Sequence, residues 1–215
     1  VARAAARQIR FLLQDAHVMA VTGGRTVALT AEAISVAAPM DITVVPAQGG
    51  MGGGVSTQAN TVAERFAQKL GGYYRFLHLP DGLSGAAADE LARLPQVREP
   101  LELVRHADVL LYGIGRAMEL AQRRGLSAAE RDKLAQEGAV AEALGFYINA
   151  QGRVVGGGSS LAIQPEDIGR KNRAAAVAAG RAKAEAILAV CAHHPHKLLV
   201  VDEGAALRMM ELLRA

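Results

Sequence analysis

Short runs of valine, isoleucine and leucine alternate along this chain with longer segments in which apolar residues recur at helical spacing. The short runs predict buried strands at residues 17–22, 41–47, 73–80, 108–115 and 196–204. The longer segments predict helices with one apolar face at residues 26–37, 56–71, 116–125, 127–138 and 180–194. Segment 172–180 is rich in alanine, which favours a helix, but its place before a predicted helix suits a strand, and we interpret it as a strand.

This alternation predicts an α/β fold with right-handed crossovers and a largely parallel sheet that has helices on both faces. The 215 residues are 51% hydrophobic, which is enough for one sizeable core, so we expect a single domain over residues 1–215. The formal net charge of +3 comes from scattered lysines and arginines. Such a charge does not require a nucleic-acid surface and suits an anionic small molecule equally well.

The cysteine content and the hydrophobic runs of the sequence predict a cytoplasmic protein without a membrane partner. A single cysteine, Cys191, excludes an intrachain disulfide and suits a reducing compartment. No apolar run approaches the length of a bilayer span, and no signal peptide is recognisable. Because the chain does not begin with methionine, we expect an N-terminal part to be missing from it.

Three loops that follow predicted strands carry the candidate chemistry, because ligands of open α/β sheets bind at the carboxyl ends of the strands. Residues 23–26 combine two glycines, an arginine and a threonine at the start of a predicted helix, which suits a phosphate. Residues 46–54 hold five glycines among nine positions, which allows backbone N–H groups to form an anion nest. Residues 113–115 lead into a helix that bears two arginines. A tight turn or a flexible loop would also explain the glycines.

Known cofactor motifs do not match these loops. No Gly-Lys-Ser/Thr follows either glycine loop, which excludes a P-loop, and the glycine spacing differs from the dinucleotide fingerprint. We therefore expect no cofactor.

A metal site is a second hypothesis, raised by the cluster Cys191, His193, His194 and His196. A tetrahedral structural site normally draws its ligands from two separated pairs, whereas these residues close one predicted helix, where cationic side chains suit the helix dipole. We expect no metal here.

Segment 126–145 superficially resembles a helix-turn-helix with Gly138 in the turn. Its second half could not read DNA, because no lysine or arginine occurs between Lys133 and Arg153.

Eight ordered motifs resemble the effector-binding domains of SorC-type bacterial transcription repressors: AVTGG.T (20–26), VPA.GG (45–50), QANT (58–61), GIG.A (113–117), AQRR (121–124), AVAEALGFYINAQGRVV (139–155), KAEAI (183–187) and VDEGAA (201–206). The resemblance runs nearly end to end. It implies a Rossmann-like fold related to phosphosugar isomerases and glucosamine-phosphate deaminases, a separate N-terminal helix-turn-helix that binds operator DNA, and a homodimer or homotetramer. It also implies a phosphorylated sugar as inducer, fructose 1,6-bisphosphate in the branch that controls glycolytic genes.

The resemblance implies a ligand site made by the two glycine loops and by three charged residues further along. Carried over residue by residue, this site comprises Gly23, Gly24, Arg25, Thr26, Gln48, Gly49, Gly50, Gly52, Gln58, Arg123, Glu142 and Lys183. The chain departs from the family at Arg25, where a threonine is usual, and at Gln48, where an arginine is usual. If both loops face one ligand, the charge around its phosphate is kept; if they do not, the effector is a monophosphate.

An enzyme is the alternative from another class, because the same fold supports sugar-phosphate isomerisation and deamination. These reactions need a carboxylate base, and Asp202 and Glu203 follow a predicted strand. The end-to-end resemblance to regulators favours a ligand sensor without catalytic residues.

Overall fold

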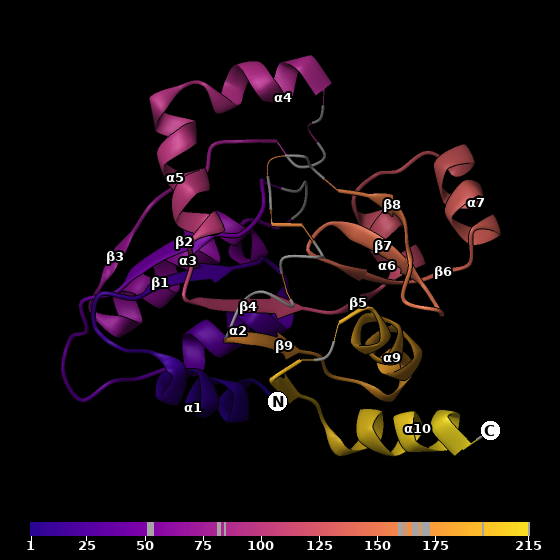
Figure 1. Ribbon diagram of the computed structural model, residues 1–215. Coiled ribbons are helices and arrows are strands. Elements are labelled where there is room, and N and C mark those ends of the chain that lie inside the picture. The colour runs from indigo at the N-terminus through magenta and orange to yellow at the C-terminus, as the bar shows by residue number, and fades with distance from the viewer. Residues whose placement is uncertain are drawn as a thin grey trace.

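The computed structural model describes residues 1–50, 54–80, 83, 85–158, 161, 163–164, 168, 173–194 and 196–214. Within them, a six-stranded parallel sheet with strand order β10-β9-β4-β1-β2-β3 forms the centre of the molecule (Figure 1). Its strands are β1 (Val18–Val21), β2 (Thr43–Pro46), β3 (Tyr73–Tyr74), β4 (Val109–Gly113), β9 (Ala174–Val177) and β10 (Leu198–Val200). The predicted α/β class with a largely parallel sheet is confirmed.

Helices cover both faces of this sheet, because successive strand side chains point to opposite faces and both sets are apolar. Met19 and Val21 of β1 pack with one group of helices, and Ala20 packs with the other. The first group is α1 (Ala2–Leu12), α2 (Arg25–Ala33) and α3 (Ala59–Leu70). The second group is α5 (Pro95–Arg105), α9 (Ala184–His193) and α10 (Glu203–Arg214).

A second, antiparallel sheet lies on the side of α9, and the strand pattern did not predict it. Its strand order is β5-β6-β7-β8, with β5 (Gly115–Arg116), β6 (Ala139–Ala143), β7 (Phe146–Asn149) and β8 (Val154–Gly157). The segment that resembles a helix-turn-helix is α7 (Ala128–Gln136) followed by strand β6. Ala141, Ala143 and Ile148 bury this sheet in the same core as α9.

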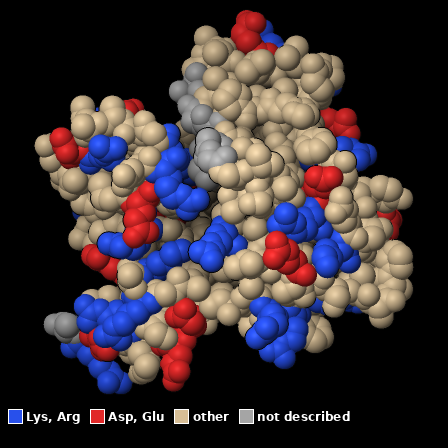
Figure 2. All heavy atoms as spheres, turned by 180° about the vertical axis from the view of Figure 1, so that it is seen from behind, with Lys and Arg blue, Asp and Glu red and all other residues tan. Residues whose placement is uncertain are grey.

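The remaining described helices surround these layers: α4 (Gly85–Ala92), α6 (Ala117–Arg123) and the short 3-10 turns η1 (Val55–Thr57) and η2 (Arg181–Lys183). None of the helices in the described ranges is long and apolar enough to cross a bilayer. On the face shown in Figure 2, basic and acidic side chains lie side by side without a continuous basic surface, as the scattered charges of the sequence indicated.

Two strand predictions have different outcomes. Segment 172–180 contains β9, so position in the chain overrides the helical preference of its alanines. The strand predicted at 73–80 is limited to Tyr73–Tyr74. Further along, the Asn60 side chain takes the place of a strand partner: its Nδ2 donates to the Leu77 carbonyl at 3.1 Å, and its Oδ1 accepts from the Leu77 N–H at 3.0 Å.

Candidate functional site

The two central strands of the parallel sheet, β1 and β4, mark the point where the order of the strands reverses. From β1 the chain continues outward to β2 and β3, whereas β4 is followed outward by β9 and β10. At the carboxyl ends of these two strands, the Gly113 N–H donates to Thr22 Oγ1 at 3.2 Å. In open α/β sheets this position opens a crevice that binds ligands.

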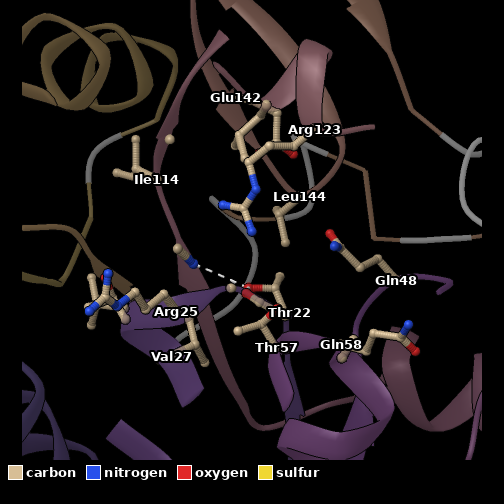
Figure 3. A pocket seen from close by; sticks show the side chains of 18 of the residues that line it. Thr22, Arg25, Val27, Gln48, Thr57, Gln58, Ile114, Arg123, Glu142 and Leu144 are labelled. Atoms are coloured by element: carbon tan, nitrogen blue, oxygen red, sulfur yellow. Dashed lines mark hydrogen bonds between the residues drawn. The ribbon is translucent and has the colours of Figure 1, made fainter. Parts of the chain in front are cut away.

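A cavity of about 130 Å³ lies at this point (Figure 3). Figure 3 shows Arg123 and Glu142 on one side, Thr22 and Thr57 on the opposite side, and Gln48 on a third side. The described residues that line it are Thr22, Gly23, Gly24, Arg25, Thr26, Val27, Gln48, Gly49, Gly54, Thr57, Gln58, Ala59, Gly113, Ile114, Gly115, Leu120, Arg123, Arg124, Glu142, Leu144, Val177 and Lys183.

The amino-terminal ends of α2 and α3 both reach the cavity. Among the described residues, no side chain caps either helix, and neither helix has an acidic residue in its first turn. In contrast, Ser127 and Glu130 form a full capping box at the start of α7. Because the first N–H groups of a helix have no partner inside it, two positive helix ends are left to face the cavity. This arrangement suits an anion.

Gly23 and Gly24 hold these two helix ends together. The Gly24 N–H donates to the Thr57 carbonyl at 2.8 Å, and Gly24 has a φ of 108°, a conformation that glycine adopts readily. A Cβ atom on Gly23 would lie 2.5 Å from the Thr57 carbonyl oxygen. The loop therefore needs glycine at position 23 for close approach and at position 24 for backbone conformation.

Lys183 brings a cation from the other side of the cavity, at the start of α9. Its Nζ donates to the Ile114 carbonyl at 2.9 Å. Burial lowers the pKa of the Lys183 ammonium, and the carboxylates of Glu119, Glu142 and Asp202 oppose this shift. A bound anion would favour the charged form of Lys183, since it would add a negative partner for the ammonium.

Glu142 and Arg124 form a buried ion pair in the wall of the cavity. Their side chains are 8% and 10% exposed, and Arg124 Nη2 lies 2.7 Å from Glu142 Oε1. The same oxygen accepts the Gly145 N–H at 2.7 Å. The pair therefore fixes the turn between β6 and β7.

The cavity gathers all of the predicted ligand residues except Gly50 and Gly52. The Gly50 N–H donates to the Leu79 carbonyl at 2.8 Å, and Gly52 lies outside the described residues. Arg25 and Gln48 both line the cavity, but Figure 3 shows them on opposite sides of it. The two departures from the family pattern thus line one cavity but lie apart within it.

Sequence reasoning missed Arg124 as a site residue, although it named its neighbour Arg123. The helical spacing of the apolar residues around position 124 could have identified Arg124. Ala117 and Ala121 are the buried residues of α6, and Arg124 follows them at the i+7 and i+3 positions, on the same face. Thr22 and Thr57 were not predicted either, because no sequence pattern distinguishes these two threonines from the others in the chain.

Leu144 occupies a strained position in the β6–β7 turn, at the cavity wall. Its φ is 56°, in the left-handed region that non-glycine residues rarely adopt, and its side chain is buried. We expect Leu144→Gly to be more stable than Leu144→Ala by about 1 kcal/mol, because both lose the packing but only glycine relieves the strain. Urea denaturation of the two variants measures this difference.

Two substitutions elsewhere in the chain serve as controls for this prediction. Ala16 is exposed and also has a positive φ of 64°, so Ala16→Gly should raise the free energy of unfolding. Ala129 is an exposed residue of α7, so Ala129→Gly should lower the free energy of unfolding. A Leu144→Gly protein less stable than Leu144→Ala would show that the turn is not strained.

The two acidic residues considered for an enzyme lie outside the cavity lining. Asp202 accepts the Gly180 N–H at 2.7 Å and the Ala205 N–H at 2.8 Å through its two carboxylate oxygens. Glu203 is exposed in the first turn of α10. Asp202 therefore fixes the starts of η2 and α10, and neither residue lines the cavity described above.

The histidines at the end of α9 contact protein groups. The Nδ1 atom of His193 lies 2.6 Å from the Gly152 carbonyl, and His196 Nε2 contacts the hydroxyl of the buried Tyr112. In the described ranges, no three His, Cys, Asp or Glu side chains are placed to hold a metal ion. These histidines thus join α9 to the β7–β8 turn and to β4.

Burial lowers the pKa of His196 from its ordinary value of 6.5. Below about pH 6.5 the unfolded chain therefore binds a proton that the folded chain does not, and folding stability falls as the pH falls. Above pH 6.5 this residue contributes no pH dependence. We expect urea denaturation at pH 7.5 and 5.5 to show a smaller loss of stability for His196→Gln than for the parent. An equal loss in both proteins would contradict a lowered pKa for the half-buried His196.

Comparison with known proteins identifies the family. The Sugar-bind family of sugar-binding domains matches residues 1–211. The chain is 34% identical to a SorC-family transcriptional regulator of Enterococcus faecalis, with a TM-score of 0.89 over 97% of this chain and 86% of that one. The chain belongs to the SorC family of sugar-binding domains. The resemblance seen in the sequence motifs is therefore confirmed.

Two curated relatives of this SorC-family domain are central glycolytic genes regulators. The chain is 39% identical to that of Priestia megaterium over 197 residues and 38% identical to that of Bacillus subtilis over 209 residues, which is 91% and 97% of this chain. It spans 57% and 62% of the length of these relatives. Because they are regulators, the SorC-family domain is grouped with regulators and not with enzymes, as predicted.

Proposed function

We propose that this domain senses a phosphorylated sugar as the inducer of a bacterial repressor of glycolytic or other sugar genes. The observation that carries the proposal is the convergence of two uncapped helix ends, α2 and α3, on a cavity that Lys183 also reaches. Backbone N–H groups with a nearby cation are the usual partners of a phosphate. Fructose 1,6-bisphosphate and related sugar phosphates are the candidate effectors.

The proposed ligand residues are the predicted ones that line the cavity, with Arg124, Thr22 and Thr57 added because they line it too. The proposed partners are operator DNA, bound through a separate N-terminal domain, and a second copy of the chain. The repressor would act in the cytoplasm. Effector binding would shift its population of states by binding one state more tightly than the other.

A thermal-shift comparison of phosphorylated and free sugars tests the proposal. A ligand at 100 times its Kd stabilises a protein by about 2.7 kcal/mol, which corresponds to about 5 to 10 °C for a domain of this size. We expect fructose 6-phosphate or fructose 1,6-bisphosphate to raise the Tm and fructose to leave it unchanged. The shift should be smaller for Arg25→Ala and unaltered for Arg7→Ala, since Arg7 is an exposed residue of α1 that does not line the cavity. Equal shifts with free and phosphorylated fructose would contradict the proposal.

A further inference from the structure

The charges of the cavity differ between its rim and its interior. Arg25 and Arg123, two of the cations that line it, are exposed. The lining residues Gln48, Leu144 and Glu142 are 4%, 3% and 6% exposed. Among the described residues, a ligand that enters the cavity therefore meets exposed arginines at the rim, the half-buried Lys183 beside Ile114, and uncharged or paired groups around Gln48 and Glu142.

The two buried charges that the structure describes in the interior form an ion pair. Glu142 and Arg124 are 2.7 Å apart, and the Gly145 N–H adds a hydrogen bond to the same carboxylate oxygen. A phosphate placed beside this pair would meet a carboxylate as well as a guanidinium. Since burying an uncompensated charge costs several kcal/mol, this end of the cavity disfavours a second phosphate.

Gln48 adds a polar group that lacks a partner. Its Oε1 atom is buried and has no hydrogen-bond partner among the described residues. Figure 3 shows the amide of Gln48 directed toward the interior of the cavity. A buried amide without a partner is costly, and a ligand hydroxyl, which both donates and accepts, satisfies either atom of the amide. A phosphate dianion could accept from Nε2 of the amide but would leave Oε1 unsatisfied, because it has no proton to donate.

We propose that the interior formed by Gln48, Leu144 and the Glu142–Arg124 pair binds the neutral, hydroxyl-bearing end of the effector, so that this chain prefers sugar monophosphates to bisphosphates. The single phosphate binds at the ends of α2 and α3, and the sugar hydroxyls extend toward Gln48. This inference rests on the proposed function and narrows its substrate class.

Calorimetric titration with two matched ligand pairs tests the preference. The pairs are fructose 6-phosphate with fructose 1,6-bisphosphate and glucose 6-phosphate with glucose 1,6-bisphosphate. For the sugar that binds more tightly, we expect the Kd of the parent domain for the monophosphate to be lower than that for the bisphosphate by a factor of about ten or more. Gln48→Met, which has a similar length but no amide, should weaken monophosphate binding several-fold. Gln8→Met is the matched control, because Gln8 is an exposed residue of α1 that does not line the cavity, and it should leave monophosphate binding unchanged.

The possible outcomes separate this inference from the proposed function. Bisphosphate binding as tight as or tighter than monophosphate binding in the parent would overturn the preference while supporting a phosphosugar sensor. Equal monophosphate affinities of the parent and Gln48→Met would overturn the role of Gln48. No binding of any of the four ligands would overturn both the proposed function and the preference. The ligand affinities of the parent domain do not depend on how well a variant folds.

Discussion

Arg124→Met should destabilise the folded domain by about 3 to 5 kcal/mol, because it removes the guanidinium that is paired with the buried carboxylate of Glu142. Methionine keeps most of the length and apolar contact of the arginine stem, so the loss reports the charge. Urea denaturation at pH 7.5 measures the effect.

The double variant and a surface control complete this experiment. Arg124→Met with Glu142→Gln removes both charges and should recover much of the lost stability. Arg116→Met breaks the exposed Arg116–Glu119 pair, whose side chains are 49% and 57% exposed, and should cost no more than about 1 kcal/mol. If Arg124→Met cost as little as Arg116→Met, the buried pair would not stabilise the cavity wall.

Gly23→Ala should weaken binding of the proposed phosphosugar by about 1.5 to 3 kcal/mol, the contribution of one hydrogen bond to a charged group. The new Cβ would lie 2.5 Å from the Thr57 carbonyl oxygen, so the first glycine loop and the start of α3 must move apart. The two helix ends would then no longer share one anion. The folded domain should also lose about 1 to 3 kcal/mol of stability from overpacking. Calorimetry measures the affinity, and urea denaturation measures the stability.

Gly204→Ala is the matched control, because the added Cβ meets its nearest neighbours at 3.7 Å, an ordinary contact. It lies in α10, where alanine favours the helix, so its stability should stay equal or rise. Its phosphosugar affinity should match the parent. A Gly23→Ala protein with parental affinity would show that the two helix ends do not act together on the ligand.

The sequence predicted the parallel sheet because its strands are continuous apolar runs, which are buried on both faces and contrast with the helical segments. The antiparallel sheet escaped prediction for the same reason. Strand β6 is alanine-rich and β8 is exposed or half-buried along its length, so neither forms a run of valine and isoleucine. Both depend on pairing with β7, and such contacts are set by tertiary structure rather than by local pattern.

The glycine loops were predicted as a candidate site because the carboxyl ends of parallel strands meet at one edge of the sheet. Their partners across the cavity could be placed only by the resemblance. Glu142 belongs to a strand, Lys183 to the start of a helix, and both are ordinary surface residue types until the fold brings them together. Whether Arg25 compensates for the arginine that is absent at position 48 depends on the distance between the two side chains in the fold, which the sequence does not specify.

A crystal structure of the domain with the sugar phosphate that gives the largest thermal shift would show directly whether the two helix ends hold the phosphate. We expect phosphate oxygens within about 3.2 Å of backbone nitrogens at the start of α2, with the sugar extending toward Gln48. A phosphate bound outside the cavity, or held in it without contact to either helix end, would contradict the account.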